Sequence, residues 1–288
     1  MTPARAMPLV PAVVLLVVFL AGPIVWALVG SLTDRALTGP GAASPTFIGL
    51  ENYTRLLADP VLGLSILVTV LFVVGSAIIG QNVLGMVLAV LFREGSRVAS
   101  AIVGAVVVVA WVLPEIVAAF VSYAFLSSDG TLNAMLAAIG ITGPNWLFSF
   151  PLVAVIVANT WRGTAFSMMI YRAALDDVSP DVVESSMLDG AGAWQRFWRI
   201  TLPIIKGTVF TNLMLTTLQT LSVFTLIWVM TRGGPGNLST TLPVFAYTEA
   251  FSFGDIGYGN AIAVVMLVIG ALFSLAYVVS LRRGSGSL

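Results

Sequence analysis

The chain has 288 residues, of which 58% are hydrophobic and 9% charged, and its formal net charge is zero. An apolar fraction this high is typical of a protein that is surrounded by lipid over most of its length. The balanced charge argues against a nucleic-acid partner, because phosphate binding requires a concentrated basic surface. The sequence contains neither cysteine nor histidine, which excludes thiol chemistry, histidine general-base catalysis and the usual transition-metal sites.

Six apolar runs are long enough to cross a bilayer as helices. The first would be roughly 31 Å long as a helix, which exceeds the apolar region of a signal peptide, so we expect a retained span. Pro114 should kink the third run, because proline lacks the N–H of a helix interior. The expected spans are 9–29, 64–92, 101–126, 151–173, 207–230 and 261–281.

The basic residues divide unevenly between the two sides of these spans. With the N-terminus inside, nine fall in inner segments and three in outer segments. Because cytoplasmic loops carry the excess of Arg and Lys, we expect both termini in the cytoplasm. The inner residues are Arg5, Arg93, Arg97, Arg172, Arg196, Arg199, Lys206, Arg282 and Arg283, and the outer ones are Arg35, Arg55 and Arg232.

Two segments outside the spans are expected to contain short helices. The outer loop 30–63 ends with helical spacing of Leu50, Tyr53 and Leu56, which predicts an amphipathic helix on the membrane surface. A second short helix is expected at 131–141. As a domain organisation we expect a first transmembrane helix with its outer loop at 1–63, followed by a permease core at 64–288 with an inner coupling loop at 174–206.

That inner loop carries the longest polar stretch of the sequence. Ser179 suits a helix N-cap, Pro180 suits the first turn, and Gly190 can adopt the left-handed conformation that ends helices. A second short helix is expected at 193–200, ending at Leu202-Pro203. The pattern is compatible with a solvated loop and with a surface on which a partner docks.

The same stretch resembles a known family. Its pattern Glu-x-x-x-x-Asp-Gly-Ala, followed by Phe-x-x-Ile-x-Leu-Pro, resembles the EAA loop of bacterial ABC importer permeases. Segments 47–53, 231–235 and 253–259 are similar to the carbohydrate-uptake branch, the maltose and glycerol-phosphate transporter type. The family's two alanines are replaced here by Ser185 and Ser186. The matched positions are Glu184, Asp189, Gly190, Ala191, Phe197, Ile200, Leu202 and Pro203.

The resemblance implies an all-α integral membrane protein, a type I importer permease bundle of six transmembrane helices with a cytoplasmic coupling helix. It implies a permease subunit that moves a sugar or sugar derivative across the bacterial cytoplasmic membrane by alternating access. The chain has no G-x-x-x-x-G-K-[ST] loop, so ATP and Mg are expected in separate ATPase subunits. A second homologous permease and an extracytoplasmic sugar-binding protein, expected as a lipoprotein, complete the implied complex. The implied ATPase-coupling residues are Glu184, Ser185, Ser186, Leu188, Asp189, Gly190 and Ala191.

Polar side chains inside the spans are candidates for a sugar pathway, because such groups are costly in lipid unless they face a partner or a cavity. They could equally join helices to one another, and Arg162 could pair with a neighbouring subunit. Gln81 and Asn82 are expected to be helix contacts. Glu115 could be read as a proton relay or as a carboxylate bound to backbone or water. The pathway candidates are Asn159, Trp161, Arg162, Asn212, Thr216, Gln219 and Thr220.

Two other functions remain open at this stage. Six helices with buried polar residues would also suit a secondary transporter that works without ATP, although the EAA-like loop argues against it. An ABC permease could also carry a non-sugar solute such as a polyamine or phosphate. An intramembrane enzyme is disfavoured, because the spans hold no histidine, cysteine or paired acids.

Overall fold

In a computed structural model, the chain is described over residues 10–285, and its regular elements in that range are helices joined by turns and loops. The only β pairing among the described residues is an isolated bridge between Thr33 and Phe47. The chain divides into two compact units: unit 1 comprises Met1–Leu64 and Leu242–Ile269, and unit 2 comprises Ser65–Thr241 and Gly270–Leu288. Arg5, on which part of the expected orientation rests, lies outside the described residues.

Unit 1 joins the N-terminal helix and outer loop to a segment from near the C-terminus. Its long apolar helix runs from Val10 to Gly30 and contains one π-helical turn. The elements are α2 (Val10–Leu16), η2 (Val17–Ala21), α3 (Gly22–Gly30), α4 (Pro40–Ala43), α5 (Glu51–Ala58), α17 (Leu242–Tyr247) and η5 (Thr248–Ser252), with parts of α6 (Pro60–Phe72) and α18 (Ile256–Ser285).

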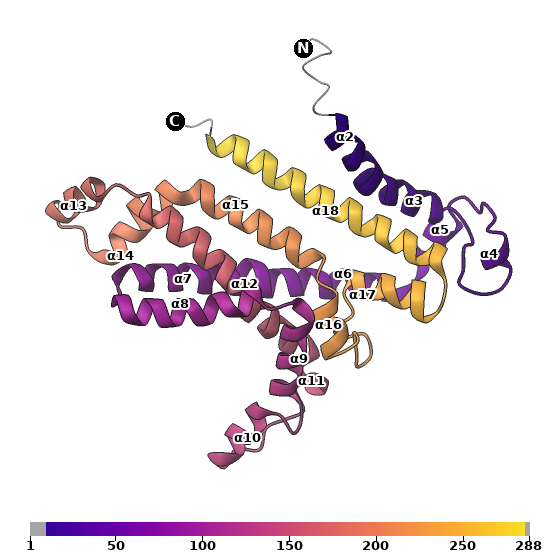
Figure 1. Ribbon diagram of the computed structural model, residues 1–288, viewed down its shortest axis with the longest axis horizontal. Helices are drawn as coiled ribbons and strands as arrows, with labels where there is room; N and C mark the ends of the chain where they lie inside the picture. The colour runs from indigo at the N-terminus through magenta and orange to yellow at the C-terminus, as the bar shows by residue number, and fades with distance from the viewer. Residues whose placement is uncertain (1–9, 286–288) are drawn as a thin grey trace, which may run out of the picture. The chain divides into compact units, whose positions relative to one another are not determined.

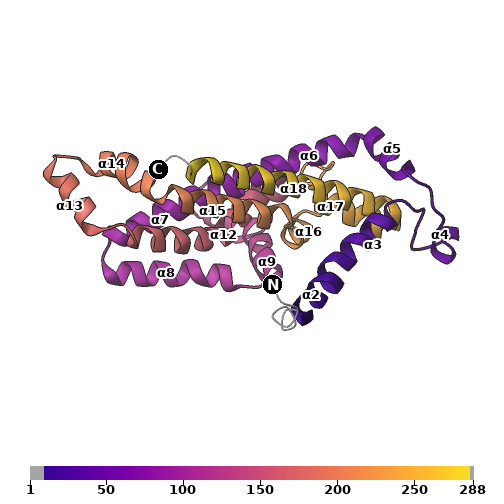
Figure 2. The same cartoon turned by 90° about the horizontal axis from the view of Figure 1, so that it is seen from above.

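Unit 2 is a helical bundle centred on its longest helix, α12, which packs against η3, α7, α8 and α15. Figures 1 and 2 show α7, α12 and α15 running side by side. The elements are η3 (Val73–Gln81), α7 (Asn82–Glu94), α8 (Arg97–Val112), α9 (Glu115–Leu126), α10 (Thr131–Ala138), α11 (Trp146–Ser149), α12 (Pro151–Asp176), α13 (Pro180–Leu188), α14 (Ala193–Arg196), η4 (Phe197–Thr201), α15 (Leu202–Leu221) and α16 (Thr225–Met230).

Small residues allow the central helices of unit 2 to approach closely. Ala89 of α7 and Ile205 of α15 pack with Tyr171 and Leu175 of α12 in one buried cluster. At Gly85 of α7, an added Cβ would lie 2.5 Å from the Cβ of Ser167 in α12. The absence of a side chain at this position is therefore what lets α7 lie against α12.

Most expected spans correspond to observed helices. Four helices in the described range are long and apolar enough to cross a membrane, and a fifth candidate is the bent pair Ser100–Val112 and Glu115–Ala138, whose axes differ by 110°. The kink expected at Pro114 is thereby confirmed. The short helices expected near 49–57 and 131–141 are α5 and α10.

The expected span 207–230 is not a continuous helix, because α15 ends at Leu221 and α16 begins at Thr225. The Ser222 hydroxyl donates to the carbonyl of Gln219 at 2.8 Å, and the Ser222 amide also turns back toward that carbonyl. A serine that bonds a preceding carbonyl in this way competes with the helical hydrogen-bond pattern. The Ser222 hydrogen bond therefore lies at the point where α15 ends.

The close approach at Gly85 predicts a destabilising substitution. Gly85→Ala should lower the free energy of unfolding by about 1–3 kcal/mol, since the new methyl group overlaps α12 and overpacking is costly. Gly207→Ala in α15 is the matched control, because a Cβ there meets nothing within 4 Å. The midpoint of heat-induced loss of monodisperse protein in detergent measures both variants. Equal midpoints would show that α7 and α12 are not in this close contact.

Candidate functional site

The EAA-like loop folds as a helix that ends in a glycine turn, as expected from its sequence. Gly190 has φ +79°, a left-handed conformation that suits glycine because it carries no Cβ. The amide of Gly190 donates to the Met187 carbonyl, and the amide of Ala191 donates to the Ser186 carbonyl, both at 3.0 Å. This pair of bonds is the Schellman arrangement, which satisfies the last carbonyls of α13.

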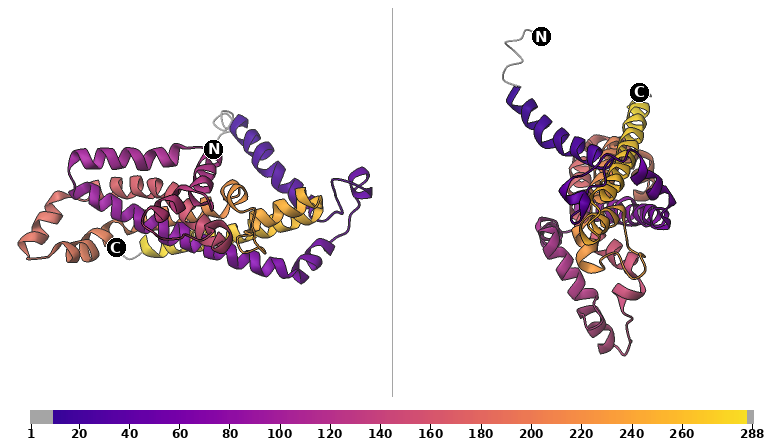
Figure 3. Two further views of the ribbon diagram at one scale, coloured as in Figure 1. Left: turned by 90° about the horizontal axis from the view of Figure 1, so that it is seen from below. Right: turned by 90° about the vertical axis from the view of Figure 1, so that its right-hand side faces the viewer.

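The tip of this loop projects beyond the ends of α7 and α8, as Figures 1 and 3 show. Glu184 and Asp189 are exposed, and no ion pair is found for either within the described part of the chain. Leu188 is 89% exposed and Met187 is 50% exposed. Exposing apolar side chains to water is unfavourable in free energy. Exposed apolar side chains at the end of a protruding helix are therefore typical of a surface that another protein covers.

The two serines that replace the family's alanines bond to their own helix. The Ser185 hydroxyl donates to the Asp181 carbonyl at 2.7 Å, and the Ser186 hydroxyl donates to the Val183 carbonyl at 2.6 Å. Ser185 is exposed whereas Ser186 is buried. Because both hydroxyls have a backbone acceptor within α13, the substitutions preserve the small volume of alanine without leaving a polar group unpaired.

The second half of the loop differs from the sequence expectation. The helix expected to end at Leu202-Pro203 instead continues from Ala193 to Leu221 as α14, η4 and α15. The Leu202 amide donates to the Phe197 carbonyl, five residues earlier, so a π-helical turn precedes the proline. Pro203, which has no amide hydrogen to donate, directly follows this π-helical turn as the second residue of α15. The Arg196 guanidinium donates to the Ala191 carbonyl at 2.8 Å and ties the glycine turn to α14.

A buried network of polar side chains joins the helices of unit 2. Asn212 of α15 donates to Asn82 of α7 at 2.7 Å and to Ser167 of α12 at 2.9 Å. Asn82 also accepts from the Tyr171 hydroxyl and donates to Thr216. All these side chains are buried. The hydrogen bonds therefore cross between three helices, which is the arrangement expected of polar groups that hold a membrane bundle together.

Asn159 forms a second contact of the same kind. Its side chain donates to Ser76 at 2.8 Å and lies 3.5 Å from the Thr220 hydroxyl, while its carbonyl accepts from Gln81. Sequence-predicted pathway residues thus fall into two groups. Asn159, Asn212, Thr216 and Thr220 are buried and bonded between helices, as is Asn82, whereas Trp161, Arg162 and Gln219 remain partly or largely accessible.

Arg162 has an unusual environment for a charged residue. It lies near the middle of α12, an apolar helix of 26 residues, and its Nε atom is buried without a hydrogen-bond partner. The described residues place no carboxylate within ion-pair distance of it. A guanidinium in such a segment is costly unless something outside this chain or a polar solute pairs with it.

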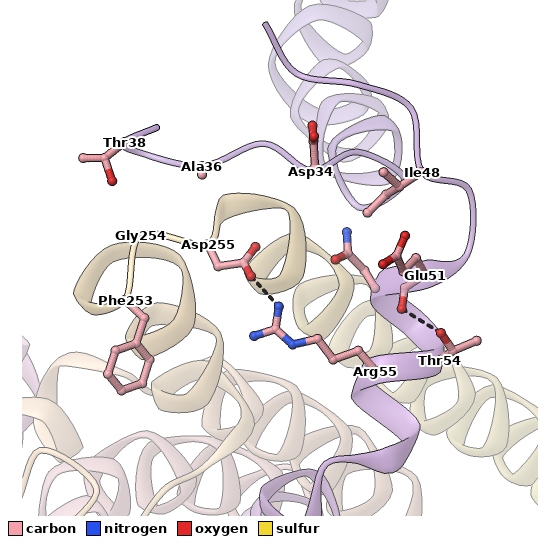
Figure 4. A pocket seen from close by; sticks show the side chains of 11 residues that line it. Asp34, Ala36, Thr38, Ile48, Glu51, Thr54, Arg55, Phe253, Gly254 and Asp255 are labelled. Atoms are coloured by element: carbon pink, nitrogen blue, oxygen red, sulfur yellow. Dashed lines mark hydrogen bonds and ion pairs between the residues drawn. The ribbon is translucent and has the colours of Figure 1, made fainter. Parts of the chain in front are cut away.

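Unit 1 contains a polar pocket of about 730 Å³, shown in Figure 4. It brings together the outer loop and the segment before α18, which are about two hundred residues apart. Backbone hydrogen bonds hold these two segments together. The Leu37 amide donates to the Gly254 carbonyl at 2.7 Å, and the Gly257 amide donates to the Arg35 carbonyl at 2.8 Å. The lining residues are Asp34, Ala36, Thr38, Ile48, Glu51, Asn52, Thr54, Arg55, Phe253, Gly254 and Asp255.

The pocket carries three acidic groups and one arginine. Arg55 pairs with Asp255 at 2.5 Å, and its guanidinium lies 4.0 Å from the centre of the Tyr258 ring. Hydrogen bonds from Thr46 lower the pKa of Asp34, so this carboxylate is ionised at neutral pH. Because Asp34, Glu51 and Asp255 outnumber Arg55, the charged side chains that line the pocket carry a net negative charge.

Sequence reasoning did not identify this pocket. Segments 47–53 and 253–259, which contribute to the pocket, both resemble the carbohydrate-uptake branch. The resemblance alone does not predict that the two segments are in contact. Nothing in their local spacing indicates that they meet. The contact depends on the fold, which brings Asp255 to Arg55.

Comparison with known proteins identifies relatives over nearly the whole chain. The trehalose/maltose transport system permease protein MalF of Thermococcus litoralis is 32% identical over 234 residues, covering 80% of this chain and 78% of that protein. The sulfoquinovosyl glycerol transport system permease protein SmoG of Agrobacterium fabrum is 30% identical and covers 95% and 89%. The lactose transport system permease protein LacF of Rhizobium radiobacter is 30% identical and covers 92% and 89%.

The fold also matches a solved structure. A chain of a bacterial alginate ABC transporter, crystallised with an alginate pentasaccharide-bound periplasmic protein, superposes with a TM-score of 0.83 at 23% identity, covering 97% of this chain and 94% of that one. The two chains therefore share the type I ABC importer permease fold. Residues 81–284 match the family model for the inner membrane component of binding-protein-dependent transport systems. With the protruding α13 and the polar bundle of unit 2, this match shows that the chain belongs to that family of transport permeases.

Proposed function

We propose that this chain is the membrane-spanning permease subunit of an ATP-driven importer that carries a sugar or sugar derivative. The observation that carries the proposal is α13, which presents an exposed carboxylate and exposed apolar side chains at the tip of a projecting loop. The first four residues that match the EAA pattern, Glu184, Asp189, Gly190 and Ala191, lie on this helix and its glycine turn, and the other four lie in η4 and α15. The sugar class is supported by the relatives named for trehalose/maltose, lactose and sulfoquinovosyl glycerol.

In the proposed complex, α13 is the coupling helix and docks in a groove of a separate ATPase subunit. Leu188 and Met187 would be buried there, and Glu184 would pair with a basic residue of the ATPase. Six spans with both termini in the cytoplasm put this loop on the ATPase side, consistent with the nine inner and three outer basic residues. ATP and Mg bind to the ATPase, and a second homologous permease completes the pathway.

The cargo pathway is proposed to use the accessible polar residues of unit 2 rather than the bonded ones. Trp161 offers an indole face for the C–H side of a sugar ring, and Arg162 and Gln219 can bond hydroxyl groups. The residues Asn159, Asn212, Thr216 and Thr220 act in this scheme by holding the pathway helices in register. The division into an N-terminal part at 1–63 and a permease core at 64–288 is also part of this proposal.

The pocket of unit 1 is proposed as a contact for the extracytoplasmic sugar-binding protein. It lies on loops assigned to the outer side, and its acidic surplus suits a lysine or arginine of a docking protein. A secondary transporter would need neither this pocket nor α13, and no ATPase would copurify with it. The absence of stoichiometric ATPase after mild purification from the native host would therefore favour that alternative.

The coupling proposal predicts the effect of a charge reversal at Glu184. Glu184→Lys should reduce transport-coupled ATP hydrolysis by about tenfold or more, because it places like charges across the contact. Asp177→Lys, an exposed acid just before α13, is the matched control and should leave coupling intact. ATPase copurification and vesicle uptake measure both variants. Unchanged uptake in Glu184→Lys would show that this face of α13 does not contact the ATPase.

The pathway proposal predicts that substitution of a bonded residue lowers stability, whereas substitution of an accessible residue lowers transport. Asn212→Leu should lower the free energy of unfolding by about 1–3 kcal/mol, because Asn82 and Ser167 lose their donor. Arg162→Gln should leave the thermal midpoint unchanged and lower the rate of sugar uptake. Thermal unfolding in detergent and uptake per folded complex separate the two effects. Normal uptake by Arg162→Gln would exclude Arg162 from the pathway.

The docking proposal predicts that Glu51→Lys weakens binding of the extracytoplasmic sugar-binding protein to the permease. Glu51 is exposed and lines the pocket, and its carboxylate is not part of the Arg55–Asp255 ion pair. The binding-protein concentration for half-maximal ATPase stimulation should rise about tenfold at low salt and less at high salt. Asp129→Lys, an exposed acid of unit 2, serves as the control. An equal response in both variants would contradict the docking site.

A further inference from the structure

Two interrupted helical segments of unit 2 meet at one carboxylate. The segment α8–α9 is broken at Pro114, and α15–α16 is broken at Ser222–Phe224. Glu115, the first residue of α9, accepts a hydrogen bond from the Leu226 amide in the first turn of α16, with Oε1 3.1 Å from the nitrogen. The two residues are 111 positions apart, so the bond is a tertiary contact between two helix starts.

The Leu226 amide needs such an acceptor. The first amides of a helix have no intrahelical partner, and Leu226 is 0% exposed, so water cannot serve in its place. The start of α9 also presents unpaired amides with partial positive charge. A carboxylate between the two helix starts stabilises both, whereas an apolar side chain would leave a buried donor without an acceptor.

The two helices joined by this bond pack closely along their length. The face of α9 toward the interior consists of small residues, since Ala118 and Ala119 are fully buried and Ser122 is nearly so. In α16, Leu226 and Ile227 are fully buried. Small residues on one side and branched residues on the other give a dense contact, and α9 and α16 are in direct contact in unit 2.

The chain breaks before α9 and before α16 have the features of hinges. The axes of Ser100–Val112 and Glu115–Ala138 differ by 110°, and Pro114 cannot donate a helical hydrogen bond, because it has no amide hydrogen. Residues 222–224 lie outside both α15 and α16. A few residues at the ends of elements can absorb the backbone rotation of a hinge, while the packed helices between them move as a body.

We propose that Glu115 is a positioning residue for transport: its carboxylate locks α9 to α16, so that the two short helices swing together about the breaks at Pro114 and Ser222–Phe224 when the permease alternates. The bond adds a directional polar contact, next to both interruptions, to the apolar packing of α9 against α16. The role requires a hydrogen-bond acceptor at this position and no proton transfer, which separates it from a proton relay. The inference rests on the proposed import function.

Substitution at Glu115 tests the role of the acceptor. Glu115→Gln keeps a side-chain carbonyl that can accept from Leu226, and uptake per folded complex should stay within about twofold of wild type with the same pH profile. Glu115→Leu removes the acceptor, and uptake should fall about tenfold or more while basal ATP hydrolysis persists. Asp129→Leu, an exposed acid beyond α9, is the control and should transport normally.

Two results would overturn the proposal. Equal loss of uptake in Glu115→Gln and Glu115→Leu would point to the charge or a proton rather than to the hydrogen bond. Normal uptake in folded Glu115→Leu complex would show that the bond affects stability alone. If the wild-type complex itself showed no ATP-dependent uptake, the proposed import function would fail, whereas either result with an active wild type rejects only the role of Glu115.

Distance measurements test the common movement without altering Glu115, and they decide the question if Glu115→Leu does not assemble. The chain has no native cysteine, so spin labels can be placed at will. Labels at Phe125→Cys in α9 and at the partly exposed Val229→Cys in α16 should keep one separation in the nucleotide-free and ATP-trapped complex. Labels at Ile102→Cys in α8 and Phe125→Cys should change separation between these states. A change in the first pair, or none in the second, would overturn the proposal.

Discussion

Pairing of polar groups within the bundle is the constraint on which the rest of this structure depends. A chain that is 58% hydrophobic offers few places where water can satisfy an amide or hydroxyl. Asn212 accordingly bonds to Asn82 and Ser167 across three helices, and Ser186 bonds back to its own helix. The two Asn212 bonds also fix the register of the helices they join, because each forms at only one relative position of the two helices.

The interruptions of the helices follow from the same constraint. At Ser222 the hydroxyl turns back on a preceding carbonyl and α15 ends, which leaves the amides of α16 without helical acceptors. Glu115 supplies an acceptor from another segment of the chain. At Pro203 a π-helical turn precedes the proline, so the rod from Ala193 to Leu221 stays continuous. Helix breaks and prolines are tolerated where a side chain or a π-helical turn provides hydrogen-bond partners for the backbone amides and carbonyls.

The exposed or unpaired side chains that are not needed for packing are the ones we propose as contacts with other molecules. Leu188 and Glu184 are exposed at the tip of α13, Arg162 has a buried nitrogen without a partner, and Glu51 lies on the rim of an acidic pocket. These positions differ in chemistry as their proposed partners do: an ATPase groove, a sugar, and a basic surface of a binding protein. A buried polar group bonded between helices contributes to the bundle and is not available to a ligand.

Much of the architecture could be predicted from the sequence, because apolar run length and local turn chemistry act over short distances. The long apolar helices, the bend at Pro114, the helix α13 and its glycine turn at Gly190 all follow from neighbouring residues. The continuity of the helix through Pro203, the break at Ser222, and the split between bonded and accessible polar residues did not follow. Only the tertiary structure decided which asparagines face a partner helix, and that Arg55 meets Asp255 and Glu115 meets Leu226, because those contacts join residues that are 45 to 200 positions apart in the sequence.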